Sequence, residues 1–130
     1  MEPSRLDISH GIILCKARLS KGRRSIFVKL AVDTGASLSL ISVEAALAIG
    51  IDPTKSKRSI EITTASGIVF VPVTPLPSLE CFGTRIKNVE VICHNLPAES
   101  PVEGLLGLNF LKAANVVLDF SRGVIEVRKR

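Results

Sequence analysis

The sequence contains no tryptophan and no tyrosine, and only five phenylalanines. Because 46% of the residues are hydrophobic, the core must be built mainly from Val, Ile, Leu and Ala. No apolar run approaches the roughly 18 residues that a membrane-spanning helix requires. The first residues are polar and lack a signal-peptide pattern, so we expect no membrane segment in this chain and a cytoplasmic location.

Cysteine and histidine are too few and too scattered to indicate a disulfide framework or a metal site. Cys15, Cys81 and Cys93 are an odd number of cysteines without the close spacing of a CxxC motif. His10 and His94 lie far apart, and no cluster of His, Cys and carboxylate residues is typical of zinc binding. We therefore expect no bound metal, and we expect the three cysteines to be buried thiols of the core.

Basic residues outnumber acidic ones, which gives a formal net charge of +5. They gather in short groups that suit either solvated turns and an end tail or a phosphate-binding face. We favour solvated turns, because the chain has few aromatic side chains on which bases could stack, and we do not expect nucleic acid as a partner. The groups are Lys21, Arg23 and Arg24, then Lys55, Lys57 and Arg58, and finally Arg128, Lys129 and Arg130.

The length suits one compact domain that spans residues 1–130. Short apolar segments separated by turn residues recur along the chain, a pattern typical of an all-β barrel or sandwich. Pro72, Pro75 and Pro77 are expected to limit ladder pairing, so the stretch around them is predicted to be an edge or a loop. The expected hairpins join 8–19 to 25–32, 59–65 to 68–73 and 116–120 to 124–128, and the expected short helices follow Ser42 and cover 109–114.

The most informative stretch is residues 33–37, Asp-Thr-Gly-Ala-Ser, which follows the apolar run 26–32. A buried carboxylate is costly unless it is paired, hydrogen-bonded or neutralised. An aspartate on a tight turn at the end of a buried strand is therefore a candidate for chemistry. The Asp-Thr-Gly triplet occurs only once in the chain.

Three further features follow the triplet. The reversal at residues 65–67, Ala-Ser-Gly, lies between two apolar strands and predicts a hairpin with a small tip. A short apolar piece bracketed by glycines, residues 104–107, lies far downstream, and a helix candidate follows it directly.

Together these motifs resemble the retropepsin-like aspartic proteases, the single-lobe relatives of pepsin. The resemblance covers the chain from about residue 25 to its end, and it implies an all-β closed barrel with short helices and one lobe per chain. It also implies hydrolysis of peptide bonds in a polypeptide substrate without a metal or an organic cofactor. Ser37 and Leu108 replace an acidic residue and an arginine that are frequent in viral members, so the chain resembles the cellular variants more than the viral ones.

The resemblance implies a role for each matching residue. Asp33 would be the catalytic carboxylate, and Thr34 would hydrogen-bond across a dimer axis. The rest of the loop would line the substrate cleft, the hairpin tip would be a flap over it, and the glycine-bracketed motif would support the loop, mainly by core packing. These residues are Gly35, Ala36 and Ser37 in the loop, Ala65, Ser66 and Gly67 in the flap, and Leu105, Leu106 and Gly107 in the supporting motif.

The chemistry implied by the resemblance needs a second carboxyl group, since one group takes a proton from water while the other protonates the substrate carbonyl. Asp119 lacks the Thr-Gly turn and is expected to be structural, so a second Asp33 would come from a symmetric homodimer. A terminal run of three like charges, 128–130, is awkward at a two-fold axis. Two alternatives stay open: a catalytically silent module for dimerisation or peptide binding, and, more weakly, a basic nucleic-acid-binding β-domain.

Overall fold

The computed structural model describes residues 3–8 and 11–128. Outside the described residues lie Lys129 and Arg130 of the terminal basic group and positions 9 and 10 of the expected strand 8–19. Position 10 is His10. The strands are β1 (Ser4–Arg5), β2 (Leu14–Lys21), β3 (Arg24–Val32), β4 (Ser39–Ile41), β5 (Arg58–Thr64), β6 (Gly67–Cys81), β7 (Thr84–Cys93), β8 (Gly104–Leu106), β9 (Val116–Asp119) and β10 (Val124–Val127). The helices are α1 (Val43–Ala48) and α2 (Leu108–Ala113), with a 3-10 turn, η2 (Pro53–Lys55).

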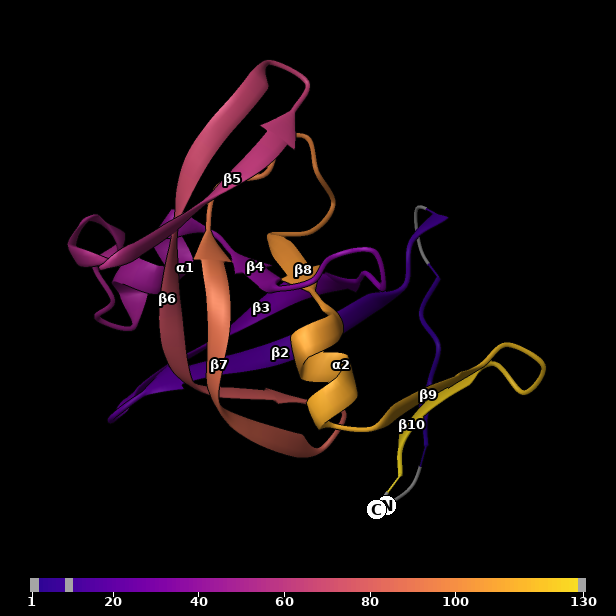
Figure 1. Ribbon diagram of the computed structural model, residues 1–130. Helices are drawn as coiled ribbons and strands as arrows, with labels where there is room; N and C mark the ends of the chain where they lie inside the picture. The colour runs from indigo at the N-terminus through magenta and orange to yellow at the C-terminus, as the bar shows by residue number, and fades with distance from the viewer. Residues whose placement is uncertain (1–2, 9–10, 129–130) are drawn as a thin grey trace.

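Most of the strands form one sheet that closes on itself. In sheet order β2 is followed by β3, β8, β4, β7 and β6, and β6 pairs back onto β2. The closing register places Arg18 opposite Glu80 and Ser20 opposite Ser78. β5 lies outside this ring and rises with the first half of β6 as a long hairpin (Figure 1). The predicted all-β closed barrel with short helices is confirmed.

An aliphatic core fills the barrel, as the composition predicts. Along β2 the buried side chains of Cys15, Ala17 and Leu19 alternate with the exposed side chains of Lys16 and Arg18. This period of two is what a strand requires when one face meets the core and the other meets water. β2 pairs with β3 over its whole length, so the first expected hairpin is present.

The two helices are short, and local sequence signals fix their ends. The Ser42 hydroxyl caps α1 by accepting a hydrogen bond from the Ala45 amide at 3.0 Å. Gly50 follows this helix with a φ of +86°, a left-handed conformation that glycine adopts without steric cost. Phe110 on α2 is fully buried, so this helix fastens directly to the barrel core.

Of the expected edge or loop around the three prolines, the loop is wrong, because β6 runs unbroken from Gly67 to Cys81, whereas an edge is present between Val73 and Ser78. β6 pairs with β5 as far as Val73 and with β2 from Ser78, and β7 pairs along its other edge. Pro75 and Pro77 lie two residues apart, so their nitrogens face the same edge of the strand. A missing N–H carries no penalty on an edge that has no neighbouring strand at that point.

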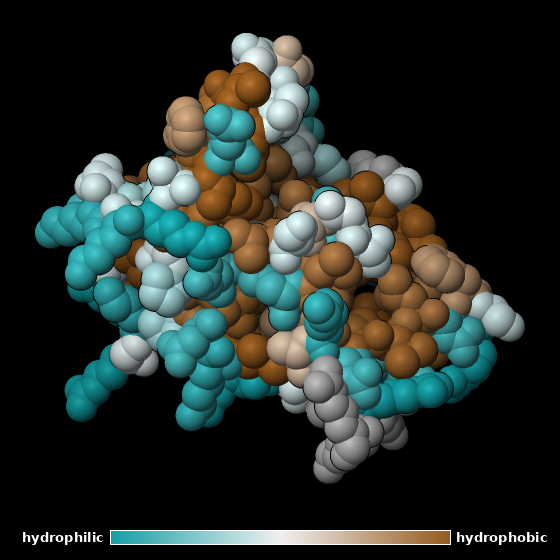
Figure 2. All heavy atoms as spheres, in the orientation of Figure 1, coloured by the Kyte–Doolittle hydropathy of each residue, from teal (hydrophilic) through white to brown (hydrophobic). Residues whose placement is uncertain are grey.

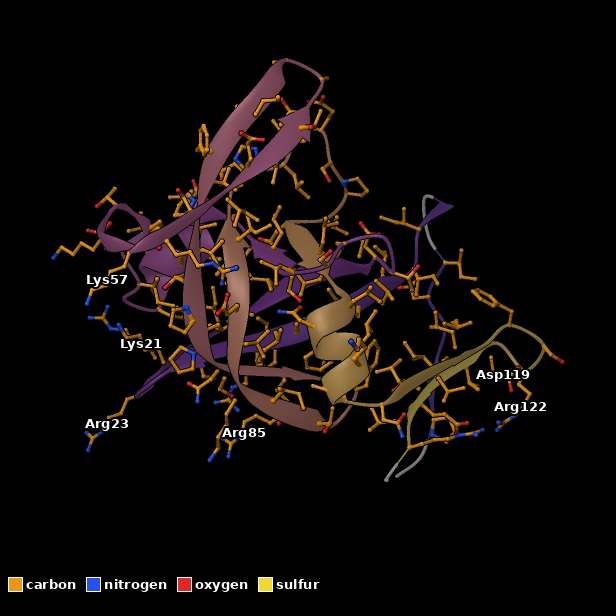
Figure 3. The ribbon with its side chains drawn as sticks, in the orientation of Figure 1. Lys21, Arg23, Lys57, Arg85, Asp119 and Arg122 are labelled. Atoms are coloured by element: carbon orange, nitrogen blue, oxygen red, sulfur yellow. The ribbon has the colours of Figure 1, made fainter. Side chains whose placement is uncertain are left out.

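A second, smaller sheet joins the two ends of the chain in the order β1, β10, β9. β9 and β10 form the expected third hairpin, with Asp119 opposite Val124. At its turn the Asp119 Oδ1 accepts a hydrogen bond from the Arg122 amide at 3.0 Å, and the two side chains form an ion pair (Figure 3). Asp119 therefore has a structural role, as expected.

The basic side chains of the turns lie at the surface. Lys21, Arg23, Lys57 and Arg85 are exposed and project away from the barrel, on the side opposite the terminal sheet (Figure 3). The Lys21 ammonium donates a hydrogen bond to the Gly50 carbonyl at 3.0 Å. No helix in the described part of the chain is long and apolar enough to cross a membrane.

The three cysteines are free and buried, so we predict that they are protected from thiol reagents. Burial raises the pKa of Cys93 from 9.0 to about 11, and the Cys81 thiol, with burial, raises the pKa of Cys15. At pH 8 the native protein should react slowly, whereas all three thiols should react in guanidinium chloride. Labelling at equal speed in both states would contradict this prediction.

The raised pKa of Cys93 predicts that the free energy of unfolding falls at alkaline pH. A thiol whose pKa is raised by folding holds its proton more tightly in the folded state, so its contribution is lost as pH rises from about 9 to about 11. Thermal unfolding across this range measures the loss. The Cys93→Ala variant lacks this thiol, so it should lose less stability across this range than the wild type. The other titrating groups are the same in both proteins.

Candidate active site

The Asp-Thr-Gly loop begins where β3 leaves the barrel wall. The Asp33 amide donates a hydrogen bond to the Leu106 carbonyl at 3.0 Å, and the Ala36 amide closes a turn onto the Asp33 carbonyl at 3.2 Å. Asp33 is half-buried, whereas Thr34 and Gly35 are exposed. The loop therefore presents its acidic residue at the edge of the barrel core.

The Asp33 carboxylate is fixed by its own loop. Its Oδ1 accepts a hydrogen bond from the Gly35 amide at 2.9 Å. A Cβ at position 35 would approach this oxygen to 3.2 Å, so glycine gives the turn room to close. In residues 3–8 and 11–128 no donor is placed against Oδ2.

The glycine-bracketed motif forms the floor beneath this loop. β8 runs parallel to β3, with Val32 opposite Leu106, and its Leu105 also lies opposite Leu40 of β4. Leu106 is fully buried and Leu105 is half-buried. The structure thus brings the two motifs together, although more than sixty residues separate them in the chain.

Gly107 is required by a close approach of backbone to backbone. A Cβ at this position would lie 2.6 Å from the Leu38 carbonyl oxygen and 2.8 Å from that of Ala36. The next amide, of Leu108, donates to the Ala36 carbonyl at 2.8 Å, and the Asn109 amide donates to the Ser37 carbonyl at 3.2 Å. Leu108 therefore supports the loop through its main chain.

Ser39 and Asn109 hold this arrangement together, and the sequence analysis did not single them out. The Ser39 hydroxyl is fully buried, donates to the Asn109 side-chain carbonyl at 3.0 Å and accepts from the Gly107 amide at 2.9 Å. The Asn109 amide group donates to the Glu90 carbonyl at 2.7 Å. A serine within the apolar run 38–41 was the only signal in the sequence that could have found this network.

The β5–β6 hairpin ends in the small tip that the sequence predicts. Ala65 and Ser66 form the turn, and Gly67 adopts a φ of +117°. The Thr64 hydroxyl donates to the Gly67 carbonyl at 2.9 Å and accepts from the Ser66 amide at 3.2 Å. The tip residues are exposed, so they are free of the barrel (Figure 1).

An apolar cluster connects the hairpin to the floor beside the Asp33 loop. Its buried members come from β4, β6 and β7, and partly buried residues of β5, β6, β8 and two loops pack against them. One face of the hairpin thus continues into the wall of the barrel, next to the carboxylate. The buried members are Leu40, Val71, Val73 and Ile92, and the partly buried ones are Leu38, Ile60, Ile62, Val69, Leu96 and Leu105.

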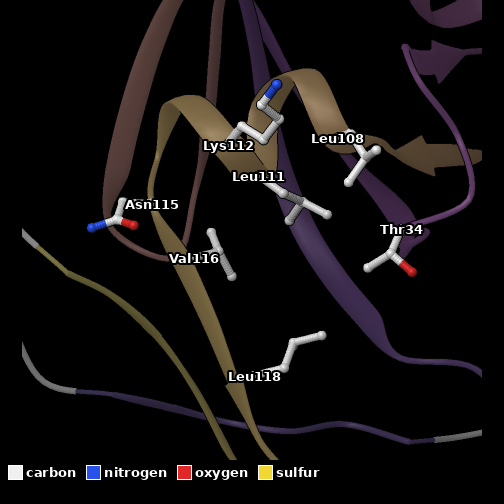
Figure 4. Close-up of a pocket in the computed structure, with 7 residues that line it drawn as sticks. All are labelled: Thr34, Leu108, Leu111, Lys112, Asn115, Val116 and Leu118. Atoms are coloured by element: carbon white, nitrogen blue, oxygen red, sulfur yellow. The ribbon is translucent and has the colours of Figure 1, made fainter.

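Thr34 borders a cavity whose lining shares no residue with this cluster. Its side chain lines an open cavity of about 390 Å³ between α2 and β9, shown in Figure 4. Leu108, Leu111, Val116 and Leu118 form most of the wall. The single loop therefore borders two apolar surfaces, one under the hairpin and one beside the terminal sheet.

The remaining described residues offer no cluster for a metal ion, since no three His, Cys, Asp or Glu side chains of residues 3–8 and 11–128 gather suitably. Asp52 caps η2, and the Thr54 hydroxyl and amide lower the pKa of its carboxyl. Asp52 and Asp119 therefore have structural positions, and neither shares the turn of Asp33.

The structure of a retropepsin-like aspartic protease from Rickettsia conorii matches with a TM-score of 0.71 and 22% identity, over 96% of this chain and 93% of that chain. No curated protein matches the sequence significantly. A protein-family model described as gag-polyprotein putative aspartyl protease matches residues 23–113, which is more than half of the chain.

The architecture is thus that of a retropepsin-like, single-lobe acid protease. The chain belongs to the family of gag-polyprotein putative aspartyl proteases. The matched segment contains the Asp33 loop, the hairpin tip and the glycine-bracketed motif, and it ends before β9.

We predict that Asn109→Ala destabilises the protein by at least about 2 kcal/mol, because it leaves the Ser39 hydroxyl and the Glu90 carbonyl without their partner. Urea unfolding measures the change. Asn95→Ala is the matched control, since the exposed Asn95 accepts only the Val43 amide and should cost about 0.5–1 kcal/mol. Equal losses in the two variants would contradict the proposed importance of the buried network.

Proposed function

We propose that the protein is an aspartic endopeptidase that works as a homodimer, with one Asp33 carboxyl from each chain. The observation that carries this proposal is the Asp33 carboxylate, whose Oδ1 is held by the Gly35 amide in a loop that main-chain hydrogen bonds fasten to the barrel. Membership of an aspartyl protease family supports it. One such carboxylate is present in each chain, so a pair requires two chains.

The pair would act on a water molecule held between the two carboxyl groups. Two carboxylates at close range cannot both ionise easily, so they share one proton. The ionised group takes a proton from the water, and the protonated group donates to the carbonyl oxygen of the scissile bond. The water attacks the carbonyl carbon, and the amine leaves after it gains a proton. The protein's own groups supply every proton transfer in this scheme.

The neighbouring residues have supporting roles in the proposal. Gly35 keeps the carboxylate turned outward, Ala36 and Ser37 continue the cleft floor, and Thr34 meets the partner's loop. The hairpin tip at 65–67 acts as a flap that closes over an extended peptide and excludes water. The peptide binds as an added strand, with alternate side chains entering pockets.

We predict that the wild type cleaves an unstructured polypeptide at mildly acidic pH and that Asp33→Asn lowers kcat by at least about 1000-fold, because the amide cannot accept the proton of water. Asp52→Asn is the matched control, since Asp52 only caps η2 and its loss should leave cleavage unchanged. Mass spectrometry of the products measures both. A dimeric wild type without cleavage from acidic to neutral pH would favour the silent binding module.

We also predict a preference for apolar residues on both sides of the scissile bond. The apolar cluster under the hairpin includes partly buried aliphatic side chains such as Leu38, Ile60 and Ile62, which stabilise apolar substrate groups and leave charged ones unsatisfied. Profiling with a peptide library that contains apolar and charged residues at these positions measures the preference. Faster cleavage next to charged residues would argue against this cleft.

A further inference from the structure

A second cavity lies between the N-terminal segment and the β2–β3 hairpin, and the turn between β6 and β7 contributes to its wall. Its volume is about 900 Å³, which falls within the range of small-molecule sites, about 300–1,000 Å³. It shares no residue with the Asp33 loop or with the cavity beside Thr34. We call it the N-terminal groove, and its charged and aromatic lining residues are Arg5, Asp7, Lys16, Phe27, Lys29 and Phe82.

The N-terminal groove is lined by three cations and one carboxylate, that of Asp7, so its charge is positive. Lys16 and Lys29 are exposed and lie directly opposite each other in the β2–β3 ladder, and Arg5 comes from β1. None of these three cations forms an ion pair within residues 3–8 and 11–128. Like charges opposite each other in a ladder repel, so an anion bound between them would relieve this repulsion.

An exposed phenyl ring lies beside these charges. The Phe27 side chain is 62% exposed, and the Lys16 ammonium lies 4.7 Å from the centroid of its ring. Any nucleic-acid base can stack on an aromatic ring, because every base has a π-face. A phosphate attached to such a base would lie near the ammonium. Ring and cation together therefore fit a ligand that has a flat group and an anionic group.

A second phenylalanine reaches the groove from an unfavourable backbone conformation. Phe82 and Gly83 form the two-residue turn between Cys81 and Thr84, with φ values of +55° and +73°. Turns of this kind favour Asn-Gly, because a bulky side chain is strained at positive φ. Phe82 packs against the barrel core and also lines the groove. Strained residues gather at ligand sites, so this position supports a function for the groove.

The groove offers few main-chain groups to an extended peptide. β2 and β3 pair with each other over the whole length of β2. On the other edge of β2, the Leu14 amide donates to the Asp7 carbonyl at 2.7 Å, and the Lys16 carbonyl accepts from the Cys81 thiol at 3.4 Å. A peptide that binds as an added strand needs a free edge. The groove therefore favours a ligand that is recognised by side chains, through charge and stacking.

We propose that the N-terminal groove binds a nucleotide, with the base stacked on Phe27 and the phosphate held between Lys16 and Lys29. Arg5 adds a third cation to the same site. The low aromatic content of the sequence argues against base stacking, but the fold places two of the five phenylalanines in one basic groove. The site does not use Asp33, so it is independent of the proposed endopeptidase.

Exposed cations continue from the groove along the β2–β3 hairpin. Arg18 lies opposite Phe27, and Lys21 lies opposite Arg24 next to the turn. Figure 3 places Lys21 and Arg23 at the end of this hairpin, and Figure 2 shows hydrophilic side chains that project on the same side. The bound nucleotide can thus be free or belong to a single strand, whose neighbouring phosphates would meet this line of charge.

Titration calorimetry with adenosine monophosphate and with a short oligodeoxyadenylate tests the proposal. Binding of the monophosphate identifies a free nucleotide as the ligand, and binding of the oligonucleotide alone identifies a nucleic-acid strand. Phe27→Leu should weaken binding at least about fivefold, because the stacking ring is lost. Phe120→Leu is the matched control, since Phe120 is 65% exposed and lies outside the groove. Equal affinities of the two variants, or no binding of either probe, overturn the proposal.

A charge variant and a second anion test the phosphate contact. Lys29→Gln should weaken binding of the same probe, and for the oligonucleotide it should lower the slope of log affinity against log salt concentration by about 1. Lys112→Gln, which removes an exposed cation of α2 outside the groove, should change neither. A polyglutamate peptide supplies charge without a base and should bind more weakly than the nucleotide probe. Binding of polyglutamate that is as tight, and that Phe27→Leu leaves unchanged, overturns the proposal in favour of an acidic peptide.

Asp33→Asn separates this site from the active site. The variant should bind the nucleotide probe with the affinity of the wild type, because no residue of the Asp33 loop lines the groove. A loss of binding in Asp33→Asn contradicts a separate site. Cleavage of polypeptide by a wild type that binds no nucleotide overturns the groove and leaves the endopeptidase proposal intact.

Discussion

The candidate site depends on the two hydrogen bonds of the buried Ser39 hydroxyl. It is the one fully buried polar side chain among residues 3–8 and 11–128. Both of its hydrogen bonds cross between segments that are distant in the sequence, and they hold β4 against the start of α2. A buried hydroxyl without partners would cost stability, so the network fixes one arrangement of these segments. The Asp33 loop is built on that arrangement.

The aliphatic core has a second role at the site. The cluster under the β5–β6 hairpin is continuous with the barrel wall, so the hairpin base and the loop floor rest on the same packed side chains. Dense packing of this kind transmits displacement between elements. The exposed tip keeps its freedom because only local hydrogen bonds of Thr64 order it. A densely packed floor and an exposed hairpin tip are thus combined in one chain.

The parts of the structure that the sequence predicted are those with local causes. Ser42 predicts the start of α1, Gly67 predicts the turn between β5 and β6, and the apolar run before Asp33 predicts β3. The continuation of β6 past Pro75 was not predictable, because it depends on which edge lacks a neighbouring strand. The partnership of Ser39 with Asn109 also depends on pairing between distant segments, and neither residue type signals it.

The parallel contact between β3 and β8 sets an order of events during synthesis. Val32 meets Leu106 only after the intervening chain has folded back, and contacts of such high sequence separation form slowly because loop closure must come first. The Asp33 loop takes its final shape from Leu106 and Gly107. A chain still emerging from the ribosome therefore lacks the finished loop until Leu106 and Gly107 have been made, which delays any reactivity of the carboxylate.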